Sequence, residues 1–456
     1  MRRTAASAAA VLAFALPALG LAACHRPPPL SSPDAGRTVG VNDADIPFDL
    51  EAGFAGAGRL EVAVGVPLSS LAFTLRGDSA SGVFRSAYAL SVRLVDADGR
   101  APVGSWSEVD TIAVRGKAST ERDSSVLHVD TFAVVPGRYT VVAEIEEHRG
   151  RRRSERRLSV EVPEAGAAAL SVPRLSRCSA GRCVRDVGYY LRAPFDSVSV
   201  ALRWAGADGV SVRAYRLRRD TTVARPPYWV GPPQGSLAAR GLSLDTADAE
   251  AIGLRGARRS DGLFEGSVPP IPAGVYAVYA RAGEATSSRT FGVASPGFPR
   301  PSTLDEAIDA LAYIAYAEEL RTMRRADSGD ERRAAFDAFW ARTAGSRVSA
   351  ERTLQRYYAR VAEANRRFTA AKLGWKTDRG MIYVVFGPPA YVEQTFTGEV
   401  WHYGASDRLA ETFTFTRGAG YGTTGGPFEP YLLERNQAYE QAWRRAVRVW
   451  RSGSTG

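Results

Sequence analysis

The chain reads Val135-Pro136-Gly137-Arg138-Tyr139-Thr140-Val141-Val142-Ala143, and further along it reads Ile271-Pro272-Ala273-Gly274-Val275-Tyr276-Ala277-Val278-Tyr279-Ala280. In both copies Pro and Gly form a turn signal, after which Tyr and Val alternate as they do in a β-strand. A polar loop and a last short run follow each copy. A tyrosine at this place is typical of the corner tyrosine of an immunoglobulin-like sandwich. The repeat therefore predicts two such β-sandwiches in tandem.

The two predicted sandwiches occupy residues 47–164 and 168–295. Short alternating runs predict their strands, among them 60–64, 71–75, 89–95 and 200–204. One run ends in Asp96-Ala97-Asp98-Gly99, which lacks the further acidic residues of an EF-hand calcium loop. We interpret it as a hairpin turn.

A Pro-rich linker, residues 295–301, separates the sandwiches from a region with helical periodicity. Thr303-Leu304-Asp305-Glu306 forms a capping-box pattern at the start of a first helix. A second helix carries Phe336, Phe339 and Trp340, and a third spans 349–373. Strands at 381–386, 399–403 and 411–416 and a terminal helix at 436–450 follow. Residues 302–456 are therefore predicted to form an α+β domain, which makes the fold class multidomain, mainly β in the N-terminal part and α+β at the C-terminus.

Residues 374–389 are the most specific segment of this domain, and they begin Gly374-Trp375-Lys376-Thr377-Asp378-Arg379-Gly380. We expect Gly374 to end the third helix in a left-handed cap and Trp375 to pin the helix on the sheet. Thr377 and Asp378 can bond to nearby amides of a tight turn, and Arg379 can pair with Asp378. Gly380 would open the apolar strand 381–386, which Gly387, Pro388 and Pro389 would end. We interpret the motif as a structural hinge, and a binding site is the alternative.

These residues resemble the GWxTD-domain family of bacterial exported proteins, over residues 339–432. The resemblance rests on spaced motifs: Phe339-Trp340, the aromatic run 357–368, segment 374–389, Glu399-Val400-Trp401-His402-Tyr403, Phe413 with Phe415, and the turn 418–421. It implies an exported, often lipid-anchored protein with β-rich domains ahead of the motif, and it supplies no reaction. The family usually has Arg-Asp-Pro where this chain has Arg342-Thr343-Ala344, and Asp where this chain has Ala390.

The N-terminus has the layout of a secretory signal, residues 1–23. Arg2 and Arg3 precede an apolar run, and Leu21-Ala22-Ala23-Cys24 resembles the lipobox of bacterial lipoproteins. We expect a lipid on Cys24 and a flexible tether over 24–46. The protein would then be anchored in the bacterial cell envelope on the extracytoplasmic side, at the outer membrane. An uncleaved anchor, or an ordinary signal with a chance cysteine, is the alternative.

Cys178 and Cys183 lie close together in the sequence around Gly181. In an oxidising compartment two such thiols are expected to form a disulfide, and a redox or metal role is the alternative. The four histidines do not cluster, so no metal and no cofactor are predicted. The histidines are His25, His128, His148 and His402.

The formal charge is +10, and all but three of the 59 basic residues are arginine. Because the arginines are spread along the chain, nucleic acid is not an expected partner. Anionic lipid headgroups or surface glycans suit the charge better. The Arg-rich loop 149–157 is either a solvated hairpin tip or a patch for such a ligand.

Two functions remain open at this point. The first is a non-enzymatic binding or assembly module whose partners are envelope proteins or glycans. The second is an enzyme acting on envelope polymers, with Asp378, Glu399 and His402 as acid/base groups. The chain has no Gly-x-Ser-x-Gly, Ser-x-x-Lys, His-Glu-x-x-His or phosphate-loop motif, so we assign no catalytic residue. The residues favour no particular oligomeric state.

Overall fold

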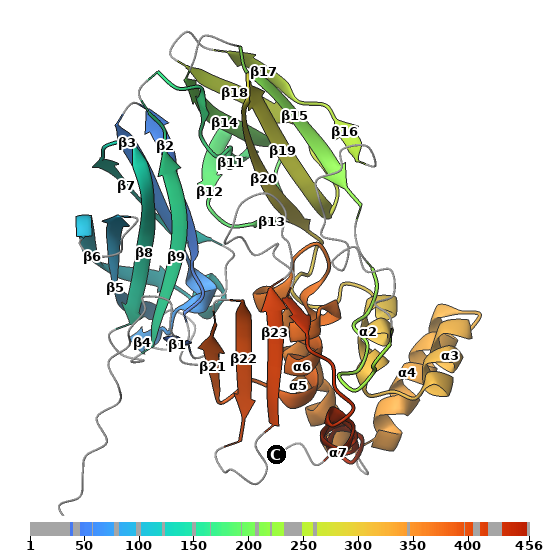
Figure 1. Cartoon of the computed structure of the whole chain (residues 1–456). Helices are drawn as coiled ribbons and strands as arrows, with labels where there is room; N and C mark the ends of the chain where they lie inside the picture. Colours follow the sequence, from blue (N-terminus) through green and yellow to red (C-terminus); the bar gives the residue numbers. More distant parts are fainter. Residues whose placement is uncertain are drawn as a thin grey trace, which may run out of the picture.

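The computed structural model describes residues 37–39, 46–56, 58–76, 82–96, 102–120, 124–147, 152–164, 166–192, 194–205, 209–218, 221–231, 249–258, 262–343, 347–395, 397–404, 411–417 and 431–453. The predicted signal peptide, Cys24 and most of the predicted tether lie outside these ranges, as do the turn at 97–99 and the loop 149–151. Two β-rich parts lie above a mixed α and β part (Figure 1).

The first β-rich part, sandwich 1, consists of two antiparallel sheets. Its smaller sheet has the order β2-β3-β7, with β2 at Asp49–Gly56, β3 at Arg59–Pro67 and β7 at Ser125–Ala133. The larger sheet has the order β4-β5-β8-β9, with β6 paired to β5. These strands are β4 Thr74–Arg76, β5 Val83–Asp96, β6 Pro102–Arg115, β8 Gly137–Glu147 and β9 Arg153–Val162. The short helices η1, Leu68–Ser70, and α1, Lys117–Thr120, lie in the connections. The predicted strand 71–75 is found only from Thr74 onward.

The second β-rich part, sandwich 2, also consists of two sheets. One sheet has the order β12-β11-β14-β18-β17, and β10 pairs with β14. Its strands are β10 Ala169–Leu170, β11 Arg174–Ser179, β12 Arg182–Asp186, β14 Ser197–Ala205, β17 Arg255–Arg258 and β18 Leu263–Val268. The other has the order β13-β20-β19-β15-β16. Its strands are β13 Tyr190–Arg192, β15 Ser211–Leu217, β16 Glu250–Ile252, β19 Gly274–Ala282 and β20 Ala285–Ala294.

Both sandwiches contain the predicted tyrosine corner. The Tyr139 hydroxyl donates to the Val135 carbonyl at 2.8 Å, and the Tyr276 hydroxyl donates to the Pro272 carbonyl at 2.7 Å. The same side chain therefore makes the same bond four residues back in each copy. Alternate residues of the following strands, such as Val141 and Val278, are fully buried in the two separate cores. The predicted fold class is confirmed.

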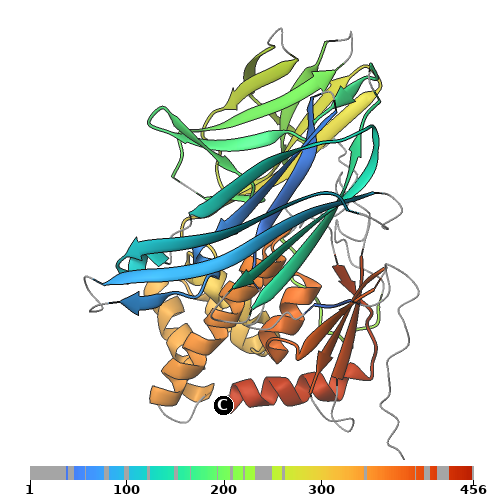
Figure 2. The ribbon, with the colours of Figure 1, turned by 90° about the vertical axis from the view of Figure 1, so that its left-hand side faces the viewer.

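The C-terminal part is an α+β domain around one aromatic core. Its sheet has the order β1-β21-β22-β23-β24. These strands are β1 Arg37–Val39, β21 Tyr391–Gln394, β22 Gly398–Tyr403, β23 Glu411–Arg417 and β24 Tyr431–Leu433. The helices are α2 Leu304–Ala310, η4 Leu311–Tyr313, α3 Ala317–Arg325, α4 Gly329–Thr343, α5 Arg347–Phe368, η5 Gly374–Lys376, α6 Asp378–Phe386 and α7 Tyr439–Arg451. Figure 2 shows α7 lying across the base of this domain.

Two predictions for this domain are wrong. Residues 381–386 belong to a helix, α6, and not to a strand. Almost every residue of α6 is buried, and a short apolar run that is buried on all sides does not reveal its period. The predicted tether contains a strand: β1 pairs antiparallel with β21, with Val39 opposite Val392. The predicted cap of α2 is present, because the Thr303 side chain accepts from the Glu306 amide.

Candidate functional site

The motif at residues 374–389 begins where η5 and α6 pack against α5. A Cβ on Gly380 would lie 1.8 Å from the Gly374 carbonyl oxygen, and a Cβ on Gly374 would lie 2.0 Å from the Ala364 carbonyl oxygen. The two glycines are needed because backbones touch at both places. The predicted left-handed cap at Gly374 is wrong, since α5 already ends at Phe368. The positive φ of the motif is at Gly387, 90°, where α6 ends.

Trp375 lies in the domain core with 2% of its surface exposed. Its amide donates to the Asn365 side chain at 3.1 Å, and its carbonyl accepts from the Tyr313 hydroxyl at 2.7 Å. The Tyr313 ring meets the indole edge-on, with 5.9 Å between ring centroids. Burial raises the pKa of the Tyr313 hydroxyl well above its ordinary value, so this group remains a donor. Trp375 thus joins three helical segments through its ring and its backbone.

Thr377 is the N-cap of α6. Its hydroxyl accepts from the Gly380 amide at 3.0 Å and donates to the Gly374 carbonyl at 2.7 Å. The hydroxyl therefore satisfies one of the amides that a helix start leaves without a partner. This is the local backbone bonding expected for Thr377.

Asp378 is bonded to distant parts of the chain instead of the turn. It forms a two-pronged ion pair with Arg435, with N–O distances of 2.6 and 3.1 Å, and accepts from the Leu433 amide at 2.9 Å. Only 8% of the residue is exposed. Asp378 therefore fixes β24 and the segment after it to the start of α6.

Arg379 pairs with Glu399 of β22 at 3.2 Å and covers the Tyr431 ring, 3.8 Å from its centroid. The predicted Asp378–Arg379 pair is wrong. Successive residues of a helix point in directions about 100° apart, so the two side chains reach different strands.

The acid/base groups of the enzyme hypothesis do not converge. Glu399 faces the core, where it accepts from the Trp401 indole at 2.9 Å as well as from Arg379. His402 lies on the opposite face of β22, because side chains alternate along a strand. It stacks on Tyr391, with 4.2 Å between centroids, and lies 3.6 Å from a Glu393 oxygen.

A segment of sandwich 2, residues 221–231, covers the outer side of the motif. The Ala224 amide donates to the Lys376 carbonyl at 3.0 Å, and Arg435 donates to the Arg225 carbonyl at 3.2 Å. Val223, Ala224 and Tyr228 pack against the C-terminal core. No periodicity marked this segment in the sequence, so its role was missed. It places the motif at a junction between two parts of the molecule.

The C-terminal end of the motif, at Gly387, is also in close contact with other parts of the domain. A Cβ on Gly387 would lie 2.9 Å from the Arg360 guanidinium, which donates to the carbonyls of Val384 and Val385. Burial lowers the pKa of Arg360 to about 10. The Gly387 carbonyl accepts from the Tyr403 hydroxyl at 2.8 Å. Pro388 is exposed and follows the helix end.

The remaining predicted residues lie away from the motif. Cys178 and Cys183 face each other on β11 and β12 and form the predicted disulfide, with 4.0 Å between Cα atoms. In the described part of the chain no group of three His, Cys, Asp or Glu side chains could hold a metal ion. Likewise, no described helix is long and apolar enough to cross a membrane.

Arginines on the C-terminal side of residues 148–151 are paired with glutamates. Arg152 binds Glu147 at 2.9 Å, and Arg153 binds Glu144 at 2.6 Å. Arg157 likewise pairs with Glu155. These pairs engage Arg152, Arg153 and Arg157 of the predicted loop 149–157; its residues 149–151 lie outside the described ranges, and both interpretations of the loop stay predictions.

Comparison with known proteins identifies the C-terminal region. Residues 274–452 match the model of the GWxTD domain, a longer stretch than the sequence motifs covered. No curated protein matches the chain. Similar solved structures include a chimeric titin Z1Z2 (13% identity, 50% of this chain and 96% of that one, TM-score 0.16). Others are the D0–D1 domain of intimin (9%, 55% and 98%, 0.20) and the C-terminal domain of the Streptococcus agalactiae polypeptide BspA (8%, 54% and 99%, 0.17). TM-scores this low support no argument about function.

Proposed function

Because the C-terminal region of this chain is a GWxTD domain, we propose that the protein is a non-enzymatic binding or assembly module of the bacterial cell envelope. The observation that carries the proposal concerns the buried carboxylates of Asp378 and Glu399, both of which are bound by side chains of the protein itself. Asp378 is bound by Arg435, and Glu399 by Arg379 and Trp401. Carboxylates whose oxygens are already bound by arginine and indole donors do not face a cleft in which a substrate could meet them.

The connections between the three parts support a scaffold role. Glu51 and Glu61 of sandwich 1 bind Arg174, Arg185 and Arg289 of sandwich 2. Between sandwich 2 and the C-terminal domain, the Tyr190 hydroxyl donates to the Ala370 carbonyl at 2.6 Å, and the Tyr190 ring stacks on Phe298. A molecule whose parts are joined in this way presents its surfaces in one arrangement, which lowers the ordering cost of binding.

The proposed anchor is a lipid on Cys24, which would hold the chain on the extracytoplasmic side of the outer membrane. The Cys178–Cys183 disulfide supports an oxidising compartment. Strand β1 attaches the chain just after the proposed anchor to the C-terminal sheet. The C-terminal α+β domain would therefore lie nearest the membrane and the sandwiches further out, where envelope proteins or glycans are the expected partners.

Cross-linking in intact cells, followed by purification of the full-length protein, tests the proposal. We expect discrete envelope partners that are retained by Glu399→Gln, and we expect Cys24→Ser to release the protein from the membrane fraction. If no partner is captured, and a normally folded Glu399→Gln variant loses function in the cell, the protein acts through catalysis and the proposal is wrong.

A further inference from the structure

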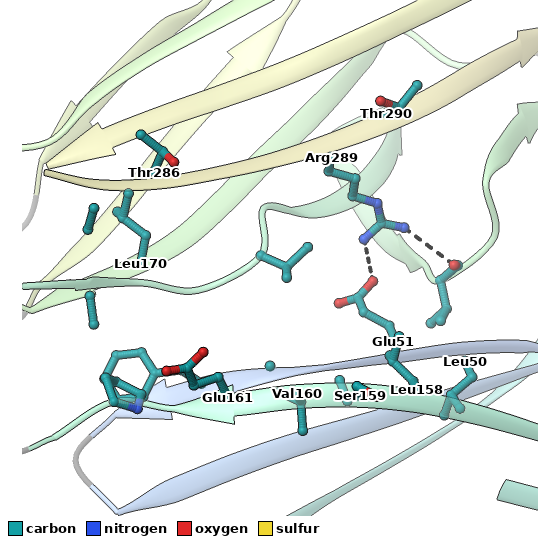
Figure 3. Close-up of a pocket in the computed structure, with 18 of the residues that line it drawn as sticks. Leu50, Glu51, Leu158, Ser159, Val160, Glu161, Leu170, Thr286, Arg289 and Thr290 are labelled. Carbon is teal, nitrogen blue, oxygen red and sulfur yellow. Dashed lines mark hydrogen bonds and ion pairs between the residues drawn. The ribbon is translucent and has the colours of Figure 1, made fainter. Parts of the chain in front are cut away.

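A cavity of about 540 Å³ lies between the two sandwiches. Its floor consists of consecutive residues of two strands, 50–54 of β2 and 158–161 of β9. Figure 3 shows Leu158, Ser159, Val160 and Glu161 in a row along one side, with Thr286, Arg289 and Thr290 of β20 on the other. Glu51 and Arg289 form a buried ion pair at one end of the cavity.

The cavity is lined by consecutive residues of β2 and β9, and this shows that it follows the backbone edge of these strands and not one of their faces. Neighbouring side chains of a strand point to opposite faces, so a cavity on one face would touch every second residue. This cavity touches each residue from 158 to 161 and therefore runs along the backbone edge. In the described part of the chain, β2 and β9 are the end strands of their sheets. An edge of this kind carries unpaired amides and carbonyls.

Sandwich 2 shows how the equivalent edge is closed. The corner tyrosines align the two hairpins: Tyr139 is opposite Val160 and Tyr276 is opposite Phe291. Glu161 and Val162 of β9 therefore hold the positions of Gly292 and Val293 in β20. In β20 these positions are covered by a parallel strand, β13, with Tyr190 opposite Gly292 and Leu191 opposite Val293. Sandwich 1 has no such strand among the described residues.

The geometry points to a docking slot at the β9 edge for an extended peptide of a partner protein, which binds as a short strand parallel to β9. This inference rests on the proposed binding role and names one site for it. Strand addition to a free edge obtains affinity from main-chain hydrogen bonds and specificity from alternate side chains. A volume of about 540 Å³ is in the range of pockets that bind small ligands, roughly 300–1,000 Å³.

Apart from the Glu51–Arg289 pair and the exposed Glu161, the walls of the slot are uncharged and suit an uncharged strand. From sandwich 2, Leu170 and Val172 provide apolar contacts, and Thr286 and Thr290 provide hydroxyls. Leu50 and Val160 pack against the core of sandwich 1 and meet the slot at their backbone. At the end of the cavity with the ion pair, the two terminal nitrogens of Arg289 bind Glu51 and the carbonyls of Pro173, Asp186, Val187 and Gly188. The buried Nε of Arg289 has no partner among the described residues. Alternating small apolar and hydroxyl side chains would match this lining.

The described residues ahead of β2 contact other parts of the molecule. Residues 37–39 pair with β21, and the Ile46 amide donates to the Ser154 hydroxyl at 2.7 Å, at the beginning of β9. Ile46 thus meets β9 outside the slot, and none of the described residues occupies it.

The test measures binding of a fluorescent peptide, acetyl-Thr-Val-Thr-Val-Thr-Val, to the full-length protein in detergent. The matched control peptide has the same side chains but N-methylated backbone amides, which cannot donate to the strand edge. Each main-chain hydrogen bond contributes about 1 kcal/mol, so losing two should weaken binding about tenfold or more. Hydrogen exchange should show new protection of amides in 158–162 when the unmodified peptide binds.

A matched pair of variants locates the site. Gly53 lines the slot, and a Cβ there would meet only Val172, at 3.7 Å or more. Gly53→Ala should leave peptide affinity within about twofold, since its methyl makes ordinary contacts, whereas Gly53→Trp should fill the slot and reduce affinity at least about tenfold. Thermal melts of both variants check that the fold is retained.

Several outcomes would contradict the proposal that a partner peptide binds in this slot. They are no binding at millimolar peptide, equal binding of the N-methylated peptide, and unchanged affinity of a folded Gly53→Trp variant. Slow exchange at 158–162 in the free protein would mean that the slot is already filled. Dependence of that protection on protein concentration would then identify a second copy, and independence would identify this chain's own segment. These failures concern the slot alone, because the cross-linking experiment can still recover partners bound elsewhere.

Discussion

At the scale of single residues, the motif acts through contacts that its own letters do not specify. Asp378 and Arg379 are neighbours in the chain, yet one binds Arg435 and the other binds Glu399. Their partners come from β22 and the segment after β24, which meet only in the folded domain. The sequence indicated which residues mattered but not what they bind.

Trp375→Ala should destabilise the protein by about 3–5 kcal/mol, because it removes a buried indole and leaves a cavity. Val348 is 66% exposed, so Val348→Ala is the control and should change the free energy of unfolding by less than about 0.5 kcal/mol. Denaturant unfolding of both variants measures the difference. Equal midpoints would mean that the indole does not contribute to the core.

Asp378→Ala should cost about 3–5 kcal/mol, since it leaves Arg435 without its partly buried partner. A turn residue bonded only to local amides would cost about 1 kcal/mol. Arg435→Ala should cost a similar amount, and the double variant should cost clearly less than the sum of the two. An additive double variant would show that the pair is not coupled.

At the scale of elements, α6 shows where periodicity fails. Its residues 381–385 are all buried, so the usual contrast between an apolar and a polar face is missing. The helix is favoured by two features: the Thr377 side chain caps its first turn, and Gly380 allows close packing against η5. The helices α4 and α7 keep an exposed face. Helix α4 contains Phe336, Phe339 and Trp340 as predicted, and α7 was predicted to within a few residues.

Gly380→Ala tests the packing of α6 on η5. The new methyl would lie 1.8 Å from the Gly374 carbonyl oxygen, so the helix must shift, at a cost of about 3 kcal/mol or more. Gly329 also lies in a helix, but nothing is within 4 Å of its Cβ position, so Gly329→Ala should be neutral or slightly stabilising. Thermal melts of the two variants should therefore differ strongly. Similar melts would contradict the contact.

At the scale of the whole molecule, ion pairs join the two sandwiches. Burial opposes ionisation of Glu61, but the charges of Arg185 and Arg174 outweigh it and lower the pKa of the carboxyl below 4.5. Glu61 is therefore more acidic in the folded protein than in the unfolded one. Its contribution to stability is complete above the unfolded value and is lost as the pH falls through the folded value.

We expect the stability that Glu61 provides to fall away below about pH 4.5. Thermal melts of the wild type and Glu61→Gln between pH 3 and 7 measure this contribution. The two proteins should differ at neutral pH and converge in acid. A constant difference over this range would show that the charge of Glu61 does not help to join the sandwiches.

The sequence by itself determined the features that depend on neighbours along the chain. These are the two tyrosine corners, the Cys178–Cys183 hairpin, the cap at Thr303 and the helices with one polar face. Each leaves a pattern because its partners lie within a turn or a strand pair. Folding of the whole chain brings together β1 and β21, Asp378 and Arg379 with their ion-pair partners, and the segment 221–231 with the motif. Their partners are far apart in the chain, so no local period records them, and packing of the three parts selects them.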